Sequence, residues 1–254
     1  MPRFCANLTM LFTELPFMQR FAAAKEAGFD WVEVLFPYDF PGQDMRSALI
    51  KHDLKMALIN TPPPNWAGGD RGYAAVPNGE KRFQYDFKRT LRYAELLKPT
   101  HIHIMAGRAS GSVARATFIK NLKWAAALVP KQSLTIEPIN QIDMAGYFLN
   151  DFDQAADIID QVGARNLSLQ FDAYHAQMIT GDLPAVWKAH GHRARHVQVA
   201  GIPDRHEPFK GEIDYPGFFK ALDFGGYAGV VSGEYHPKDS TVQGLRWMGA
   251  GKLE

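Results

Sequence analysis

The chain alternates short β-like runs with amphipathic helical stretches, and the alternation repeats about eight times along its length. Such an alternation predicts a parallel sheet, because parallel strands need long crossover connections that are usually helices. Eight units in 254 residues give one βα unit per roughly 30 residues, the repeat expected of a (β/α)8 TIM barrel. The strand candidates are Phe4–Thr9, Trp31–Phe36, Lys55–Asn60, His101–Gly107, Leu134–Ile139, Leu167–Tyr174, Arg195–Gly201 and Gly229–Tyr235.

Residues typical of helix termini mark where several of the helices begin and end. Pro16 stands near the start of the first helix and Gly28 just past its end, while Asp151 opens the fifth helix and Gly163 closes it. The longest irregular stretch, Thr61–Gly79, is rich in Pro and Gly and follows the third strand. It is expected to be either a cover over an active site or a passive surface loop.

Length leaves two small domains open, but no linker-like segment interrupts the repeat. We therefore expect a single barrel domain over residues 1–254, in which the closing Gly-Lys-Leu-Glu carries no argument. Apolar residues make up 46% and charged residues 22% of a chain with net charge +1, which is typical of an ordinary globular protein. This charge argues against binding to nucleic acid or to an anionic membrane, which needs a basic surface.

Cysteine content and hydropathy indicate the compartment. Cys5 is the only cysteine, so an intrachain disulfide and a thiolate metal cluster are both excluded, and a reducing compartment is expected. No apolar run reaches the length of a membrane span, and the N-terminal residues lack the features of a signal peptide. We therefore expect a cytoplasmic protein.

Several strand candidates alternate polar and apolar residues, whereas parallel strands are usually apolar on both faces. In the sixth strand Ser168, Gln170 and Asp172 share one face, because side chains alternate along a strand. The same alternation occurs in the fifth, seventh and eighth strands. The polar faces are predicted to point into the barrel and the apolar faces toward the helices.

Three strands supply a carboxylate at the C-terminal tip, where barrel active sites lie: Glu137, Asp172 and Glu234. Gln198 adds an amide from the strand between the last two. Crowded carboxylates repel one another unless a cation is present. Oxygen ligands favour Mg²⁺ or Mn²⁺ over Zn²⁺, so the four residues predict a divalent-metal site. The alternative is that they form unrelated salt bridges or helix caps.

Other polar residues near the strand tips are candidates for substrate contact. They are Asn60, His103 and His175, and Arg205 in the loop after the seventh strand. A cation such as Arg205 suits an anionic substrate, because three carboxylates leave a site with Mg²⁺ one negative charge in excess. Each histidine could instead be a hydrogen-bonded structural residue, and Arg205 could form a salt bridge within its loop.

At these residues the sequence resembles the hydroxypyruvate isomerase family, within the xylose-isomerase-like barrels that also include ketose 3-epimerases and family-2 AP endonucleases. The resemblance runs nearly end to end. Its motifs are Phe4-Cys-Ala-Asn-Leu-Thr, Glu33-Val-Leu-Phe-Pro-Tyr38, Arg71-Gly-Tyr-Ala-Ala-Val-Pro77, Glu137-Pro-Ile-Asn140, Asp172-Ala-Tyr-His175, His196-Val-Gln-Val-Ala-Gly201 with Pro203-Asp-Arg-His-Glu-Pro208, Gly211-Glu-Ile-Asp-Tyr-Pro216 and Gly233-Glu-Tyr235.

The resemblance implies roles for individual residues. Glu137, Asp172, Gln198 and Glu234 match metal ligands, and the two glutamates also match the acid/base pair. His175 and Arg205 match positions that contact substrate. The sugar epimerases usually carry histidine where this chain has Gln198, which favours the isomerase side.

The expected function is therefore a metal-dependent aldose–ketose isomerase of a small hydroxy or oxo acid, using Mg²⁺ or Mn²⁺. Hydroxypyruvate and tartronate semialdehyde are the expected pair, and related 2-oxotetronates stay open. The reaction would proceed through an enediolate, with a hydride shift as the alternative. A ketose 3-epimerase, an AP endonuclease and a non-catalytic sugar-acid-binding barrel are the rival functions. The sequence leaves open whether the chain forms a homo-oligomer.

Overall fold

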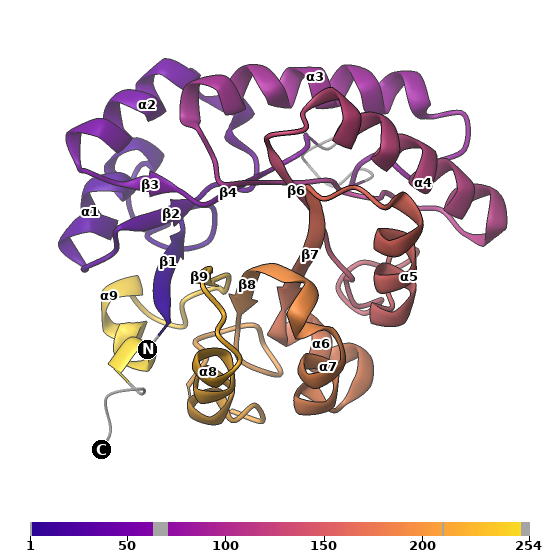
Figure 1. The fold of residues 1–254 in the computed structure, drawn as a ribbon. Coiled ribbons are helices and arrows are strands. Elements are labelled where there is room, and N and C mark those ends of the chain that lie inside the picture. The colour runs from indigo at the N-terminus through magenta and orange to yellow at the C-terminus, as the bar shows by residue number, and fades with distance from the viewer. Residues whose placement is uncertain (1, 63–70, 210, 250–254) are drawn as a thin grey trace.

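A computed structural model describes residues 2–62, 71–209 and 211–249. These residues form a parallel sheet of nine strands with helices packed around its outside (Figure 1). The strand order along the sheet is β3-β2-β1-β9-β8-β7-β6-β5-β4. The strands are β1 Arg3–Asn7, β2 Trp31–Glu33, β3 Lys55–Met56, β4 Leu58–Asn60, β5 His101–His103, β6 Ser133–Ile136, β7 Leu167–Asp172, β8 Ala194–Val199 and β9 Val230–Gly233.

The two ends of this sheet, β3 and β4, are consecutive pieces of one extended run that is divided at Ala57. β3 pairs with β2, and β4 pairs with β5. The backbone also joins β4 to the residues after β2, since Val34 N donates to Leu58 O at 3.2 Å and Asn60 N donates to Leu35 O at 2.9 Å. The run therefore joins the ends of the sheet, and β3 with β4 stands for the third of the eight predicted strands. The TIM-barrel prediction is confirmed.

Helices follow the strands as the sequence predicts. Asp151 caps α5 by accepting a hydrogen bond from Gln154 N at 2.6 Å, and Gly163 ends the helix with φ +66°. The helices are α1 Arg20–Glu26, α2 Gly42–Lys51, α3 Glu80–Leu97, α4 Gly111–Leu128, α5 Phe152–Val162, α6 Ala173–Thr180, α7 Leu183–His190, α8 Tyr215–Phe224 and α9 Thr241–Gly244.

The fourth strand is shorter than predicted, because β5 ends at His103 rather than at Gly107. The loop after β4 packs against the remaining residues: Ala75 N donates to Ala106 O at 2.7 Å. Gly72 has φ +97°, and a Cβ there would lie 2.3 Å from Met105 O, so only glycine fits this approach. The prediction of a cover at Thr61–Gly79 falls partly on residues 63–70, outside the described residues.

Polar residues line the interior of the barrel, as the alternation predicts. Gln170 on β7 contacts Thr135 on β6 and Gln198 on β8, and all three residues are buried. The opposite faces of the strands carry apolar residues such as Leu169 and Val197, which belong to the hydrophobic core. The core therefore lies between the strands and the helices, and it leaves the interior of the barrel to polar chemistry.

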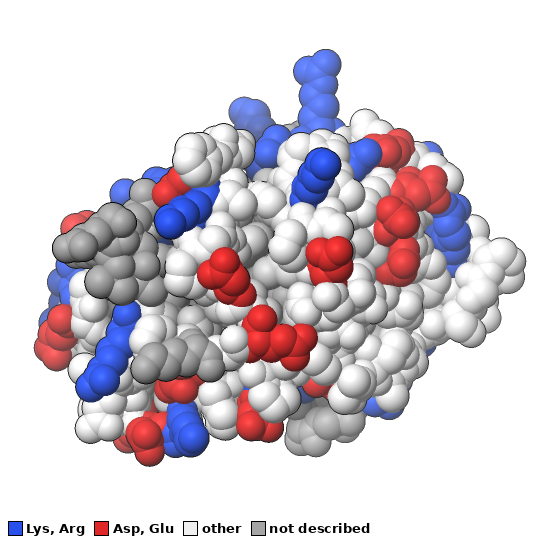
Figure 2. Space-filling view, turned by 90° about the horizontal axis from the view of Figure 1, so that it is seen from below, with Lys and Arg blue, Asp and Glu red and all other residues white. Residues whose placement is uncertain are grey.

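The described surface carries both signs of charge. On the face shown in Figure 2, acidic and basic side chains are interspersed, and the described residues form no broad basic field there. None of the described helices combines the length and the hydropathy that crossing a membrane requires.

Candidate active site

The C-terminal ends of the strands bring the predicted acids together. Asp172 ends β7, while Glu137 and Glu234 directly follow β6 and β9. A cavity of about 420 Å³ opens over them. Its polar lining residues are Thr9, Asn60, Arg71, Glu137, Asp143, His175, Arg205, Glu234 and His236. A larger hollow of about 600 Å³ lies at the N-terminal ends of the strands, but no carboxylate lines it. The cavity over the acids is therefore the candidate active site.

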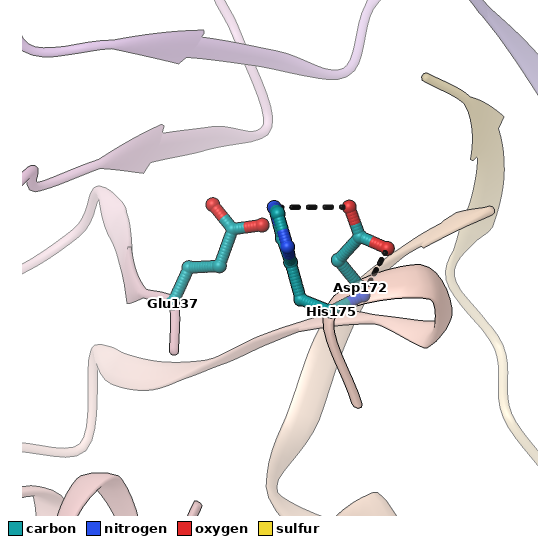
Figure 3. A group of neighbouring side chains, drawn as sticks. All are labelled: Glu137, Asp172 and His175. Carbon is teal, nitrogen blue, oxygen red and sulfur yellow. Dashed lines mark hydrogen bonds and ion pairs between the residues drawn. The ribbon is translucent and has the colours of Figure 1, made fainter. Parts of the chain in front are cut away.

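Glu137, Asp172 and His175 offer ligand atoms that all lie within 4.8 Å of one another, so this group could hold a metal ion. Figure 3 shows the His175 imidazole between the two carboxylates. Asp172 also caps α6, because its Oδ1 accepts from Tyr174 N at 2.8 Å and from His175 N at 3.3 Å. This cap fixes the start of the helix that carries His175. It leaves Oδ2 to His175 Nε2 and Arg205 Nη2, which lie 3.7 and 3.4 Å from it.

Asn140 determines the tautomer of His175. Its Oδ1 accepts from Ile142 N at 3.0 Å and Asp143 N at 2.9 Å, so its Nδ2 faces His175 Nδ1 at 2.7 Å. Burial lowers the pKa of His175 well below its usual value, so the ring is neutral. Nδ1 then accepts and Nε2 carries the proton, 3.7 Å from Asp172 Oδ2. A protonated nitrogen cannot ligate a metal, which favours the predicted contact with substrate.

Arg205 lies among the carboxylates. Its Nη2 donates to Glu234 Oε1 at 2.7 Å and to Asp172 Oδ2 at 3.4 Å, and its Nη1 lies 3.7 Å from Asp143 Oδ2. The guanidinium also lies over the Tyr174 ring at 5.1 Å. Arg205 therefore forms salt bridges, as the alternative expected, and its partners come from segments other than its own loop.

The electrostatics show how crowded these carboxylates are. Burial raises the pKa of Glu137 well above its usual range, and the charges of Glu234 and Asp172 add to the rise. Burial raises the pKa of Glu234 to about 8 and raises that of Asp172 as well, although Arg205 lowers both. One guanidinium does not neutralise three buried acids.

These shifts predict how the stability of the metal-free protein depends on pH. The pKa of Glu234 rises from the ordinary 4.5 to about 8 on folding, so within that range the folded chain binds more protons than the unfolded chain. Buried histidines with lowered pKa values oppose this effect below their ordinary pKa of 6.5. Between pH 6.5 and 8 the free energy of unfolding should therefore fall as the pH rises, and a divalent cation should reverse the fall by binding the ionised groups. Urea unfolding of chelator-treated protein at both ends of the range checks this. Stability that rises with pH would contradict the shifts.

Gln198 lies below the cavity rather than in its lining. It is fully buried, and its Oε1 accepts from Gln170 Nε2 at 2.7 Å. The same nitrogen donates to Glu137 Oε2 at 3.0 Å. Gln198 is therefore linked to the acids through Gln170, a residue to which the sequence assigned no role beyond facing inward.

The two remaining predicted residues form a pair. Asn60 and His103 are register partners on β4 and β5, and Asn60 Oδ1 lies 3.2 Å from His103 Nδ1. Asn60 lines the cavity, whereas His103 is fully buried and lies 3.6 Å from Glu137 Oε2. Burial lowers the pKa of His103 to about 3, so this ring is neutral. His103 can therefore help to fix the position of the Glu137 carboxylate from its buried side.

Sequence reasoning missed Arg71 and Asp143, which line the cavity from loops. Arg71 lies over the Phe36 ring at 5.6 Å, and Asp143 accepts from the Tyr174 hydroxyl at 3.2 Å. Loop residues carry no periodic signal, and only the quoted motif around Arg71 could have indicated the first of them.

Comparison with known proteins assigns the chain to one family. Residues 21–250 match the family model described as xylose isomerase-like TIM barrel. A 2-oxo-tetronate isomerase from Cupriavidus necator is 44% identical over 254 residues, and the match covers 98% of each chain. A hydroxypyruvate isomerase from Escherichia coli is 39% identical with the same coverage. A crystal structure described as an AP endonuclease, family 2, from Brucella melitensis has a TM-score of 0.95 at 40% identity and covers 100% of both chains.

Proposed function

Because the chain belongs to the xylose isomerase-like TIM barrel family, we propose that this isomerase interconverts a small 2-oxo acid and its 2-hydroxy-3-oxo isomer with a divalent metal. Hydroxypyruvate and tartronate semialdehyde, or the corresponding 2-oxotetronates, are the proposed substrates. The observation that carries the proposal is the cluster of three buried carboxylates beneath a cavity that Arg205 also lines. The cluster supplies acid/base groups, and the arginine suits a carboxylate substrate.

The residues at the site fit Mg²⁺ or Mn²⁺. Glu137, Asp172 and Glu234 are acids with raised pKa values in a donor set made of oxygen, and a hard divalent cation would stabilise their ionised forms. We propose these three residues and Gln198 as the ligands. When bound, the cation supplies electrophilic stabilisation of adjacent carbonyl and hydroxyl oxygens of the substrate.

The two glutamates are proposed to transfer the proton. One removes the proton from the hydroxyl-bearing carbon, and a proton returns to the neighbouring carbon of the enediolate from the other. Both glutamates line the cavity at the strand ends, where they can reach a carbon of a bound substrate. His175 Nε2–H is proposed to donate a hydrogen bond to a substrate oxygen, and Asn60, which lines the same cavity, is proposed as a further substrate contact.

Arg205→Lys should raise KM for acid substrates by about tenfold or more, because a hydrogen bond to a charged group contributes about 1.5–3 kcal/mol. Lysine keeps the charge but loses the planar set of donors, of which Nη2 already bridges Asp172 and Glu234. Steady-state kinetics with an acid substrate, together with calorimetric titration of Mn²⁺, provide the measurement. A Mn²⁺ affinity that falls as much as KM rises would assign Arg205 to holding the acids rather than to recognising a carboxylate.

A substrate panel tests the proposal directly. Purified protein with Mn²⁺ is offered hydroxypyruvate, tartronate semialdehyde, 2-oxotetronates and free ketohexoses, and the products are separated chromatographically. Turnover confined to the acids supports the proposal, whereas C3 epimerisation of the ketohexoses would replace it by a ketose 3-epimerase. D-psicose 3-epimerase from Clostridium cellulolyticum shares the fold with a TM-score of 0.77 but only 14% identity.

We further propose one barrel domain, a small-molecule substrate as the main partner and a cytoplasmic location. The net charge of +1 and the interspersed charges in Figure 2 suit a small acid better than a nucleic acid. Cys5 is buried, and burial raises the pKa of its thiol well above the usual value, so it is a poor nucleophile.

A further inference from the structure

A network of buried polar residues runs across the interior of the barrel beneath the acids, and Glu33 is its anchor. Glu33 ends β2 and is fully buried. Its Oε1 accepts from Asn7 Nδ2 at 2.8 Å and from Gln198 Nε2 at 2.9 Å, and its Oε2 lies 2.6 Å from His196 Nε2. Three donors from β1 and β8 therefore converge on one carboxylate.

The direction of these bonds is fixed at both ends. Asn7 Oδ1 accepts from the backbone nitrogen of Thr9 at 3.0 Å, so the nitrogen of this amide must face Glu33. A carboxylate surrounded in this way acts only as an acceptor. Gln198 must therefore turn its Nε2 toward Glu33 and its Oε1 toward Gln170.

The chain of hydrogen bonds continues from Gln198 to the carboxylate cluster. Gln198 Oε1 accepts from Gln170 Nε2, which also donates to Glu137 Oε2. The Thr135 hydroxyl donates to Gln170 Oε1 at 3.1 Å, so both ends of the second amide have partners. The orientation of the Gln198 amide thus depends on the Glu33 carboxylate, which accepts from its Nε2.

We propose that Glu33 is a positioning residue that holds the Gln198 amide with its oxygen toward the metal site. The inference rests on the proposed function, because it gives Gln198 the role of an oxygen ligand. A turned amide would present N–H groups to a cation that requires oxygen. Glu33 itself does not line the cavity, although its charge adds to the rise that burial causes in the pKa of Glu137 and of Glu234.

Two conservative variants distinguish the effect of the position of the Glu33 carboxylate from the effect of its charge. Glu33→Asp keeps the charge but shortens the side chain, so the carboxylate no longer reaches all three donors. Glu33→Gln removes the charge but keeps the length and an oxygen that can accept from Gln198. Calorimetric titration with Mn²⁺ alone should show a loss of affinity of about 10–100-fold for Glu33→Asp and a markedly smaller loss for Glu33→Gln. Asp86→Asn, which changes another buried acid on α3, is the matched control and should leave the affinity unchanged.

The same titration in a Gln198→Met background completes the test. If Glu33 acts through Gln198, adding Glu33→Asp to Gln198→Met should cause no further loss. An undiminished further loss, or a Glu33→Gln loss as large as that of Glu33→Asp, would overturn the proposal. If near-UV circular dichroism shows that Glu33→Asp does not fold, Glu33→Gln decides: a loss as large as that of Gln198→Met overturns the proposal, and a smaller one supports it. Wild-type protein that binds no Mn²⁺ would instead refute the proposed metal function, and with it this inference.

Discussion

Glu137→Gln and Glu234→Gln should each lower turnover by about 10²–10⁴-fold, the usual contribution of a positioned acid or base. Glutamine keeps the shape and one oxygen, so the fold and part of the metal ligation should persist. Both glutamates are almost fully buried and line the cavity, so they can reach the carbon-bound proton of a substrate. Steady-state rates of metal-loaded variants give the measurement, and Asp86→Asn serves as the inert control.

Exchange of the carbon-bound hydrogen with deuterated water distinguishes the two glutamates. If Glu137 opens the reaction from one side, Glu137→Gln should lose both turnover and exchange. Glu234→Gln should then retain some exchange while forming little product. Near wild-type turnover in both variants, verified as metal-loaded, would show that the proton-transfer roles are wrong.

Removing the metal should abolish activity, and Mg²⁺ or Mn²⁺ should restore it. Asp172→Asn should raise the Mn²⁺ concentration needed for half-maximal activity, because it removes one charge from a site that binds the cation by charge. Asparagine is also a good helix cap, so it can still accept from Tyr174 N and His175 N and preserve α6. Atomic absorption confirms the metal content before each assay. Full activity in demonstrably metal-free protein would refute the metal site.

The barrel and its acids follow from one sequence pattern. Polar–apolar alternation identified the inward faces of the strands, and the position of the strand ends brought Glu137, Asp172 and Glu234 together, as the structure confirms. The C-terminal boundary of β5 depended on packing instead. The sequence pattern continues beyond His103, but there the loop that contains Gly72 packs against the chain, and Ala75 N donates to Ala106 O.

Contacts across the interior of the barrel could not be predicted in the same way. Glu33 lies on β2 and Gln198 on β8, and two strands separate them in the sheet order. Periodicity shows which face a residue occupies but not how far it reaches across the barrel. The pairing of Arg205 with Asp172 and Glu234 likewise depends on the path of the loop after β8, which carries no periodic signal.

The most direct test of the central claim follows Mn²⁺-loaded wild-type protein with hydroxypyruvate and the 2-oxotetronates in deuterated water. Chromatography with mass detection separates each substrate from its isomer and reads the deuterium content of both. The proposed function predicts isomer formation from at least one acid, dependence on the metal, and substantial deuterium on the carbon that gains the proton. Isomer without deuterium would indicate a hydride shift. The absence of any isomer from every acid, with the metal confirmed in place, would contradict the proposed function.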